Sequence, residues 1–547
     1  MKKKLYRLHR QLSIIIAIPV FLWASSGFMH PLMTNIRPAI ATQGWPAVVV
    51  DSTRLRVPLA AALRMHHLDS FANVRLVHID TNWFYQVQPM RRGVAAAGPG
   101  VIAAPVSPAV QPTVPVYLSC TNGNVLPAGD WLYAQYLARH FLEGGSVGGP
   151  RMEMRAAPIH VVLASAHVVV PAETAPDCCG AATECVLNPA RGAKVANVSL
   201  LNGYDNEYKS INRLLPVYRV SFDRPHGIRI YVETTQDRFS FAMDNRRAVF
   251  DEIFRLFHTW GWLDGLGKGR MVVELIFALL AFCTVSLGVY LFFSTRAAKA
   301  KNNPLVRTRR YHRYTAIVAS LFTLFWSFSG GYHALTKLIT AEDRVGPVPA
   351  NFAAAGAGFD YSRIQAAVVQ PITNLSLARI DGTIYWRVSL QSAKPDGRKD
   401  LMKDGKALFA PVAYVRAADY SVLPDGDRRY AAALAGMFSG RSGAGSVSPV
   451  TAFNDEYNFT DKRLPVWRVS YPGAGDPRYY VETSSGQLAA FMNDALYAEG
   501  YSFSVFHKHH FMDWAGKTVR DGSTMFWAVI QVLMVTIGLI LYFRFRK

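Results

Sequence analysis

Six histidines recur along the 547-residue chain as three matched pairs. The pairs are His9 with His312, His30 with His333, and His258 with His507. A neutral imidazole is a common metal ligand, and it can also carry protons near neutral pH. Two imidazoles that face each other at one depth suit the two axial positions of a b-type haem. The pairs therefore predict haem b, most simply two bis-histidine haems.

The sequence leaves the ligand pairing of one site open. His30 could meet His333, or His258 and His507 could each act with the His30 or His333 of its own repeat. Zinc is a competing metal, but no Cys or acidic residues lie at matching spacing. A proton relay is a third interpretation, since ionisable groups in membranes are usually functional. Glu274 would suit a relay, although the equivalent position holds Ser523.

Two long apolar stretches must position these histidines. Leu5–Leu32 and Arg310–Leu335 each carry two histidines 21 residues apart, a helical rise of roughly 31 Å. Both open with His-Arg and both contain Trp, then Ser-Gly, then His, at a constant offset of 303. A match of this length indicates an internal duplication. Arg10 and Arg313 follow the first histidine of each copy and could pair with haem propionates.

Four segments are long and apolar enough for transmembrane helices, which need about 20 such residues. They are Leu12–Met33, Met271–Phe293, Tyr314–Leu338 and Thr524–Phe543. A cleaved signal peptide is the competing interpretation of the first segment. The third segment repeats its ending far from the N-terminus, which argues against cleavage.

The formal net charge is +21, and half of the residues are hydrophobic. Much of the positive charge flanks the apolar segments, at the N-terminus, between the second and third spans, and at the C-terminus, so membrane lipid rather than nucleic acid is the expected contact. The positive-inside rule places these clusters in the cytoplasm of a bacterial inner membrane and the large segments in the periplasm. The four spans divide the chain into seven expected parts, of which 35–268 and 340–522 are periplasmic. The parts are 1–34, 35–268, 269–294, 295–313, 314–339, 340–522 and 523–547.

The two large outer segments also repeat each other. Tyr204–Tyr208, Leu215–Val220 and Tyr231–Thr234 match Phe453–Tyr457, Leu464–Val469 and Tyr480–Thr483 at an offset of 249. Alternating apolar residues that end in turn-forming residues predict antiparallel strands. A weaker copy precedes each, so we expect two small αββ modules per segment. The predicted fold class is a duplicated four-helix membrane protein with α+β outer modules.

A stretch before each even-numbered span carries aromatic residues and histidines. Phe250–Phe257 is amphipathic and predicts a helix along the outer membrane surface before His258. The residues that we expect at an outer substrate mouth are Trp260, Trp262, His509, His510 and Phe511. An aromatic belt at the membrane interface would also explain them.

Four of the five cysteines lie in the first outer segment: Cys120, Cys178, Cys179 and Cys185. An oxidising periplasm favours a disulfide that involves Cys185, with its partner undetermined. Cys283, in the second span, is expected to serve packing.

Taken together, the His-Arg openings, the Ser-Gly before an outer histidine, the Phe-His before the next span and the Tyr-Val-Glu-Thr hairpins resemble the PepSY-associated transmembrane family. The resemblance covers essentially the whole chain. It implies an inner-membrane, haem-containing ferric-siderophore reductase that serves iron acquisition by releasing Fe(II) in the periplasm. It implies outer-sphere electron transfer, which needs no catalytic acid or base.

Some members of this family carry a fused flavin and nicotinamide domain, whereas this sequence ends at Lys547 directly after the fourth span. We therefore expect electrons from a separate cytoplasmic reductase or from a quinol. The alternative from a different class is a non-redox PepSY membrane protein that binds or regulates a periplasmic partner.

Overall fold

The structure is a computed structural model. It describes residues 2–89, 114–144, 152–155, 160–163, 166–169, 184–187, 192–212, 214–296, 303–339, 351–356, 358–392, 406–458 and 463–544. The chain forms two compact units. The helical unit contains residues 1–37, 245–342 and 494–547, and the sheet unit contains residues 38–244 and 343–493. Residues 245–268 and 494–522, which we had assigned to the outer segments, thus pack with the long helices.

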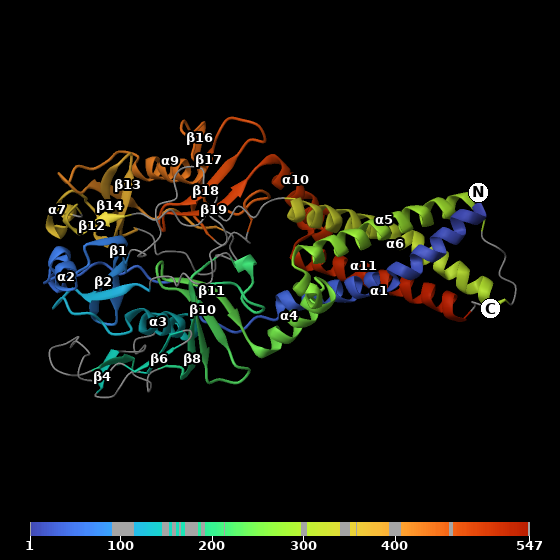
Figure 1. Ribbon diagram of the computed structural model, residues 1–547, viewed down its shortest axis with the longest axis horizontal. Helices are drawn as coiled ribbons and strands as arrows, with labels where there is room; N and C mark the ends of the chain where they lie inside the picture. Colours follow the sequence, from blue (N-terminus) through green and yellow to red (C-terminus); the bar gives the residue numbers. More distant parts are fainter. Residues whose placement is uncertain are drawn as a thin grey trace. The chain divides into compact units, whose positions relative to one another are not determined.

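The helical unit is built from four long helices and the short elements between them (Figure 1). The long helices are α1 (Lys2–Asn35), α5 (Lys268–Ser294), α6 (Pro304–Ile339) and α11 (Lys517–Arg544). The short elements are α4 (Asn245–Phe257), η4 (Gly261–Leu266), α10 (Asp494–Ser502), η7 (Phe503–His507, a π-helix) and η8 (His510–Ala515). α1 packs against α5 and α11, and α6 packs against the same two helices.

Three of the described helices, α1, α5 and α11, are long and apolar enough to cross a membrane. The fourth expected span, Tyr314–Leu338, lies in α6 but does not reach the same apolar content. The reason is local composition, because hydroxyl residues and glycines interrupt its apolar run. They are Thr315, Ser320, Thr323, Ser327, Ser329, Gly330 and Gly331. The expectation of four spans is therefore corrected to three helices that qualify by length and composition.

Among the described residues, the sheet unit contains four antiparallel sheets of three or four strands. In the first segment, β1-β2-β3 joins Ser70–Ile79, Asn82–Pro89 and Val116–Ser119, and β12 (Phe352–Ala353) of the second segment pairs with β1 at the edge of this sheet. The other sheet of the first segment, β11-β10-β9-β8, joins Arg238–Met243, Arg229–Glu233, Val217–Phe222 and Val195–Leu201. In the second, β13-β14-β15 joins Ile372–Ile380, Thr383–Leu390 and Val412–Arg416, and β16-β17-β18-β19 joins Ser446–Val450, Val466–Ser470, Arg478–Glu482 and Gln487–Met492. Two short ribbons pair β4 (Met152–Arg155) with β7 (Glu184–Leu187), and β5 (His160–Leu163) with β6 (Ala166–Val169).

A helix lies between the two sheets of each segment. Apolar residues of α3 (Gly129–Glu143) pack with residues of β1–β3 and of β8–β10 in one buried core. α9 (Gly426–Ser439) fills the same place between β13–β15 and β16–β19. Shorter helices, α2 (Leu59–Met65) and α7 (Tyr361–Ala366), contribute Leu59 and Ile364 to a further core.

That further core joins the first sheet of one segment to the first sheet of the other. Apolar residues of β1–β3 and of β13–β15 are buried together. The Asn374 Oδ1 atom accepts a hydrogen bond from the Leu76 backbone N–H (3.1 Å), and the Asn73 Oδ1 atom accepts one from the Leu377 N–H (3.0 Å). The duplicated sequence thus pairs with its own copy through reciprocal contacts.

The second sheets are also joined, through buried charges. Glu482 of β18 accepts a hydrogen bond from Arg463 (2.6 Å) and one from Arg238 of β11 (2.5 Å). Its repeat equivalent, Glu233, lies 3.8 Å from Arg238 and 3.9 Å from Arg463. These four residues form the buried charge cluster. Burial alone would raise the pKa of Glu482, but Arg238 and Arg463 lower this pKa well below its usual value.

Cysteine placement is described only in part. Cys120 is a buried free thiol, and Cys283 is a free and exposed thiol on α5. Cys185 lies in strand β7. The other two cysteines of this segment, Cys178 and Cys179, lie outside the described residues.

The buried charge cluster predicts unequal effects for two matched substitutions. Glu482→Gln leaves two buried guanidiniums without their main carboxylate, so we expect it to lower the free energy of unfolding by about 3–5 kcal/mol. Glu233→Gln removes only the longer contacts and should cost clearly less. Urea unfolding of the full chain, followed by tyrosine fluorescence, measures both; equal losses would contradict the assigned geometry.

The same carboxyl predicts a pH dependence. Because the folded-state pKa of Glu482 lies below its unfolded value, its contribution to stability is present above an unfolded pKa of about 4.3 and is lost as the pH falls further. The stability difference between wild type and Glu482→Gln should therefore shrink as the pH falls below about 4. A difference that stays constant to pH 3 would contradict this assignment.

Candidate functional site

His9 and His312 form the first tier of histidines. His9, on α1, donates from Nδ1 to the Thr284 carbonyl oxygen of α5 at 3.1 Å. Its ring lies over Gly288, where an added Cβ would approach the His9 Cε1 atom to 3.1 Å. Because a carbonyl can only accept, Nδ1 carries the proton and the Nε2 lone pair is left for a ligand.

His312, on α6, repeats this arrangement against α11. Its ring lies over Gly538, where an added Cβ would come within 3.2 Å of His312 Cε1. The Met534 carbonyl faces the ring, as the Thr284 carbonyl faces His9, but Nδ1 is buried without a hydrogen bond of normal geometry. Thr284 and Met534, like Gly288 and Gly538, are 250 residues apart. The duplication has therefore preserved the support of each ring as well as the histidine.

Four histidines form the second tier: His30, His258, His333 and His507. His258 follows α4, and His507 ends the π-helix η7. Their ring centres are 6.0 Å apart, and their planes cross at 83°. From the sequence we considered His30 with His333, or His258 and His507 each with the His30 or His333 of its own repeat. The structure instead brings His258 next to His507, with nearly perpendicular ring planes.

Each histidine of this pair is held by a serine of the neighbouring long helix. Ser26 Oγ lies 3.1 Å from His258 Nδ1, and Ser329 Oγ lies 3.2 Å from His507 Nδ1. Both hydroxyls donate their single proton to a carbonyl of their own helix, Ser26 to Leu22 (2.6 Å) and Ser329 to Phe325 (2.7 Å). Each serine can therefore only accept from its histidine, which assigns the proton to Nδ1 and leaves Nε2 unprotonated.

His30 and His333 lie behind the central pair, separated from it by phenylalanines. The ring of Phe254 stacks on His258 at 4.4 Å and contacts His30 at 5.2 Å. In the second copy, Phe503 stacks on both His333 and His507 at 4.5 Å. His333 also donates from Nδ1 to the Glu499 carboxylate. His30 and His333 therefore flank the central pair rather than meeting each other.

The surroundings keep the central imidazoles neutral. Burial, and then the neighbouring His30, lower the pKa of His258 to about 4. Burial, followed by His258, His333 and the cationic Lys508, lowers the pKa of His507 well below its ordinary value. At neutral pH both rings thus retain a free lone pair, which is the form that binds a metal.

The donor set fits haem iron. A metal–imidazole bond is about 2 Å long, so one ion between two facing rings would hold their centres slightly more than about 6 Å apart. The observed separation is 6.0 Å. Within the described part of the chain, no three His, Cys, Asp or Glu side chains gather as a metal site. A pair of histidines suits a structural zinc site poorly, because such a site takes four protein ligands. A haem iron takes only two axial ligands from the protein.

The two arginines expected beside haem propionates differ. Arg313 donates from Nη1 to the Thr295 hydroxyl at 2.7 Å and from Nη2 to the Phe292 and Thr295 carbonyls. It therefore binds the C-terminal end of α5, where a cation is favoured by the helix dipole. Arg10 is exposed on α1.

The expected mouth residues separate into two groups. Trp262 is 62% exposed, Phe511 is 44% exposed, and His510 is partly exposed beside Asp513. Trp260 and His509 are 3% and 0% exposed, which differs from our expectation. Both have positive φ angles that turn them inward, Trp260 onto Trp23 and His509 onto Trp326. Of the expected mouth residues, only Trp262, Phe511 and His510 therefore remain accessible to a substrate.

Several supporting residues were not assigned from sequence. Ser26 and Ser329 were visible as part of the helical repeat, but their contact with His258 and His507 needed the fold. Glu499, which accepts from His333, has Phe250 at the equivalent position, so the repeat gave no signal for it. Gly288 and Gly538 could have been found as a matched glycine pair.

No protein-family model matches the chain, and no curated protein matches it. The arrangement of histidines therefore carries the functional argument.

The glycine beneath His9 predicts a selective defect. Gly288→Val places a branched side chain against the His9 ring, so we expect it to abolish the haem binding that the sequence predicts for the first tier and to spare that of the second. Haem titration into the purified protein, followed at the Soret band, should then show one binding site fewer per chain. Gly522→Val is the control, because this exposed helical glycine has nothing within 4 Å of an added Cβ. Equal haem stoichiometry in Gly288→Val and wild type would contradict the first tier.

Proposed function

We propose that this chain is an inner-membrane b-type haem protein that reduces ferric siderophore iron to Fe(II) on the periplasmic side. The observation that carries the proposal is the His258–His507 pair. Both rings are anchored through Nδ1 to a serine, both are neutral, and their centres are 6.0 Å apart. Two anchored imidazoles with free Nε2 atoms are suited to bis-histidine ligation.

A second argument comes from the first tier. His9 and His312 are supported by equivalent carbonyls and glycines near the basic ends of α1 and α6. When bound, haem supplies a reversible one-electron couple at each tier. The protein contributes the imidazole ligands, fixes their tautomers and packs apolar side chains around them, which sets the potential and limits access of water.

The proposal places all four long helices across the membrane. α6 is the least apolar, but its hydroxyl groups are satisfied within the helix: Ser320 donates to Ile317, Thr323 to Ala319, and Ser327 to Thr323. Satisfied polar groups on a helix packed against others are tolerated in bilayers. The basic residues beside the helices then orient both termini to the cytoplasm.

The reduction would proceed by outer-sphere electron transfer. A ferric chelate needs only to approach the second tier closely enough for an electron to pass, so no side chain must act as an acid, base or nucleophile. Trp262 and Phe511 are exposed near this tier, in the stretches that follow His258 and His507. Electrons would come from a separate cytoplasmic reductase or from a quinol.

The first test of this function is haem content. We expect the full chain purified from haem-replete cells to be red, with a Soret band that shifts on dithionite reduction. His258→Ala and His507→Ala should each lose the second-tier haem, whereas Trp262→Ala should keep it. A pyridine haemochrome assay gives haem per chain. A colourless protein would instead favour a non-redox membrane protein that binds a periplasmic partner.

The second test is the reaction. Dithionite-reduced protein, freed of excess reductant, should be reoxidised by ferric siderophore, and a ferrous chelator should trap one Fe(II) per electron delivered. Unchanged haem spectra after addition of several ferric chelates would contradict the reductase assignment while leaving haem binding intact.

A further inference from the structure

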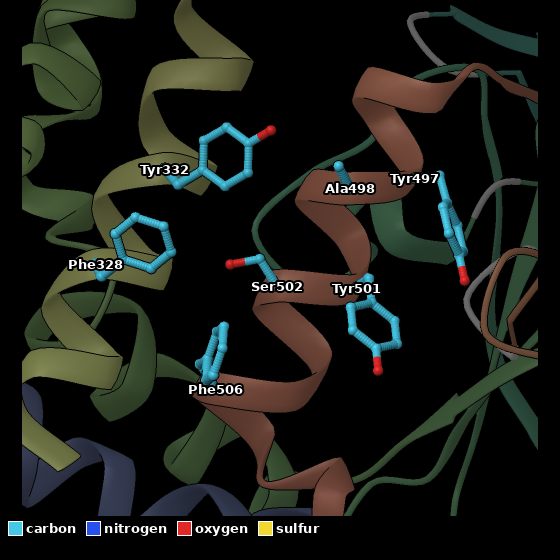
Figure 2. A pocket seen from close by; sticks show the side chains of 7 residues that line it. All are labelled: Phe328, Tyr332, Tyr497, Ala498, Tyr501, Ser502 and Phe506. Atoms are coloured by element: carbon cyan, nitrogen blue, oxygen red, sulfur yellow. The ribbon is translucent and has the colours of Figure 1, made fainter. Parts of the chain in front are cut away.

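A cavity of about 370 Å³ lies between α6 and α10, beside the second tier (Figure 2). Its lining is mostly aromatic: Phe328, Tyr332, Tyr497, Ala498, Tyr501, Ser502 and Phe506. Ligand pockets usually measure about 300–1,000 Å³, so this one is sized for a small group such as a single substituted ring.

One polar group in this apolar cavity is unsatisfied. Ser502 is 7% exposed, and its Oγ atom is buried without a hydrogen-bond partner among the described residues. Figure 2 shows the hydroxyl pointing from α10 toward Phe328 and Tyr332. A buried hydroxyl without a partner is destabilising, so its retention indicates a ligand that hydrogen-bonds with it.

The cavity breaks the internal symmetry of the chain. Tyr332 corresponds to Met29 by the helical offset of 303, and Tyr501 and Ser502 correspond to Glu252 and Ile253 by the offset of 249. The first repeat therefore lacks both the aromatic wall and the hydroxyl. Since the histidine sites are duplicated and the cavity is not, the cavity serves something other than holding a histidine ligand.

Its position connects it to the second tier. Phe506 immediately precedes His507, and Phe328 immediately precedes Ser329, whose Oγ atom accepts from the His507 ring. Two further neighbours, His333 and Glu499, follow the lining residues Tyr332 and Ala498 and are hydrogen-bonded to each other. A redox-active ring in the cavity would therefore lie beside the second tier.

We propose that this cavity binds the head group of a membrane quinol, which donates electrons to the second tier. Aromatic walls suit the flat ring, and the Ser502 hydroxyl suits a quinone oxygen as hydrogen-bond donor. A lipid acyl chain would satisfy the walls but would leave Ser502 without a partner. This proposal rests on the proposed function, in which the chain needs an electron donor.

The overall step balances with ferric chelate as the oxidant. One quinol loses two electrons and two protons to become a quinone, and two ferric ions each take one electron to become Fe(II). The two O–H bonds of the quinol break. The two protons are released to solvent.

The binding test uses decylubiquinone with the detergent-solubilised full chain in equilibrium dialysis. Ala498→Trp fills the cavity from an exposed position of α10 and should weaken binding at least tenfold. Ser502→Ala removes one hydrogen bond and should weaken it about two- to tenfold. Val249→Trp is the matched control, because Val249 is the equivalent exposed residue of the first repeat, and it should bind as wild type does. Equal affinity of wild type and Ala498→Trp would overturn the proposal, as would equally tight competition by decanol.

A second readout separates this proposal from the reductase function. Decylubiquinol should reduce the haem of wild type and of Val249→Trp but not that of Ala498→Trp, while dithionite-reduced Ala498→Trp should still be reoxidised by ferric chelate. Quinol reduction that persists in Ala498→Trp would overturn the quinol site. A third outcome is that decylubiquinone binding is lost in Ala498→Trp but no ferric chelate reoxidises the reduced protein. This result would support the quinol site and reject the reductase function.

Discussion

The hydrogen bond from a histidine Nδ1 to a serine whose own proton is already committed determines what the helical unit can do. Ser26 and Ser329 each donate to a carbonyl one turn back, which leaves only a lone pair for the histidine. That constraint fixes the tautomer and the direction of His258 and His507, while burial keeps both rings neutral. Without it, either ring could rotate and place its proton on Nε2, which would then have no lone pair for a ligand.

The duplication gives this constraint twice, and the departures from symmetry are as informative as the matches. The helix contacts of His9 and His312 are equivalent, and so are the phenylalanine stacks beside His258 and His507. Around them the copies diverge. Trp260 of the first copy is replaced by His509, and Tyr332, Tyr501 and Ser502, which line the cavity, correspond to Met29, Glu252 and Ile253. Paired positions hold the histidines and their supporting residues, and unpaired positions distinguish one repeat from the other.

Much of this organisation could be predicted from the sequence because repeats and periodicity are local signals. The matched histidines, the long apolar helices and strands such as β9 at Val217–Phe222 all follow from spacing along the chain. The partners of the histidines could not be predicted in the same way. Whether His258 faces His507 or His30 depends on the crossing of helices that are distant in sequence. The burial of Trp260 and His509 depends on positive φ angles, which the sequence pattern does not specify. The lower apolar content of α6 was also missed, because its hydroxyl residues were counted as part of an apolar run.

The shared core of the sheet unit has a consequence for how the protein is made. The core that contains Leu76 also contains Leu377, and Glu482 of the second segment neutralises Arg238 of the first. Helices α5 and α6 separate these segments along the chain. The first segment therefore emerges during synthesis with one sheet face uncovered, and it stays so until the second segment has been made. Such an intermediate exposes apolar strands for the time needed to translate two long helices, which is a situation that calls for a chaperone. For the same reason, a gene split between the two halves would have to produce both polypeptides together.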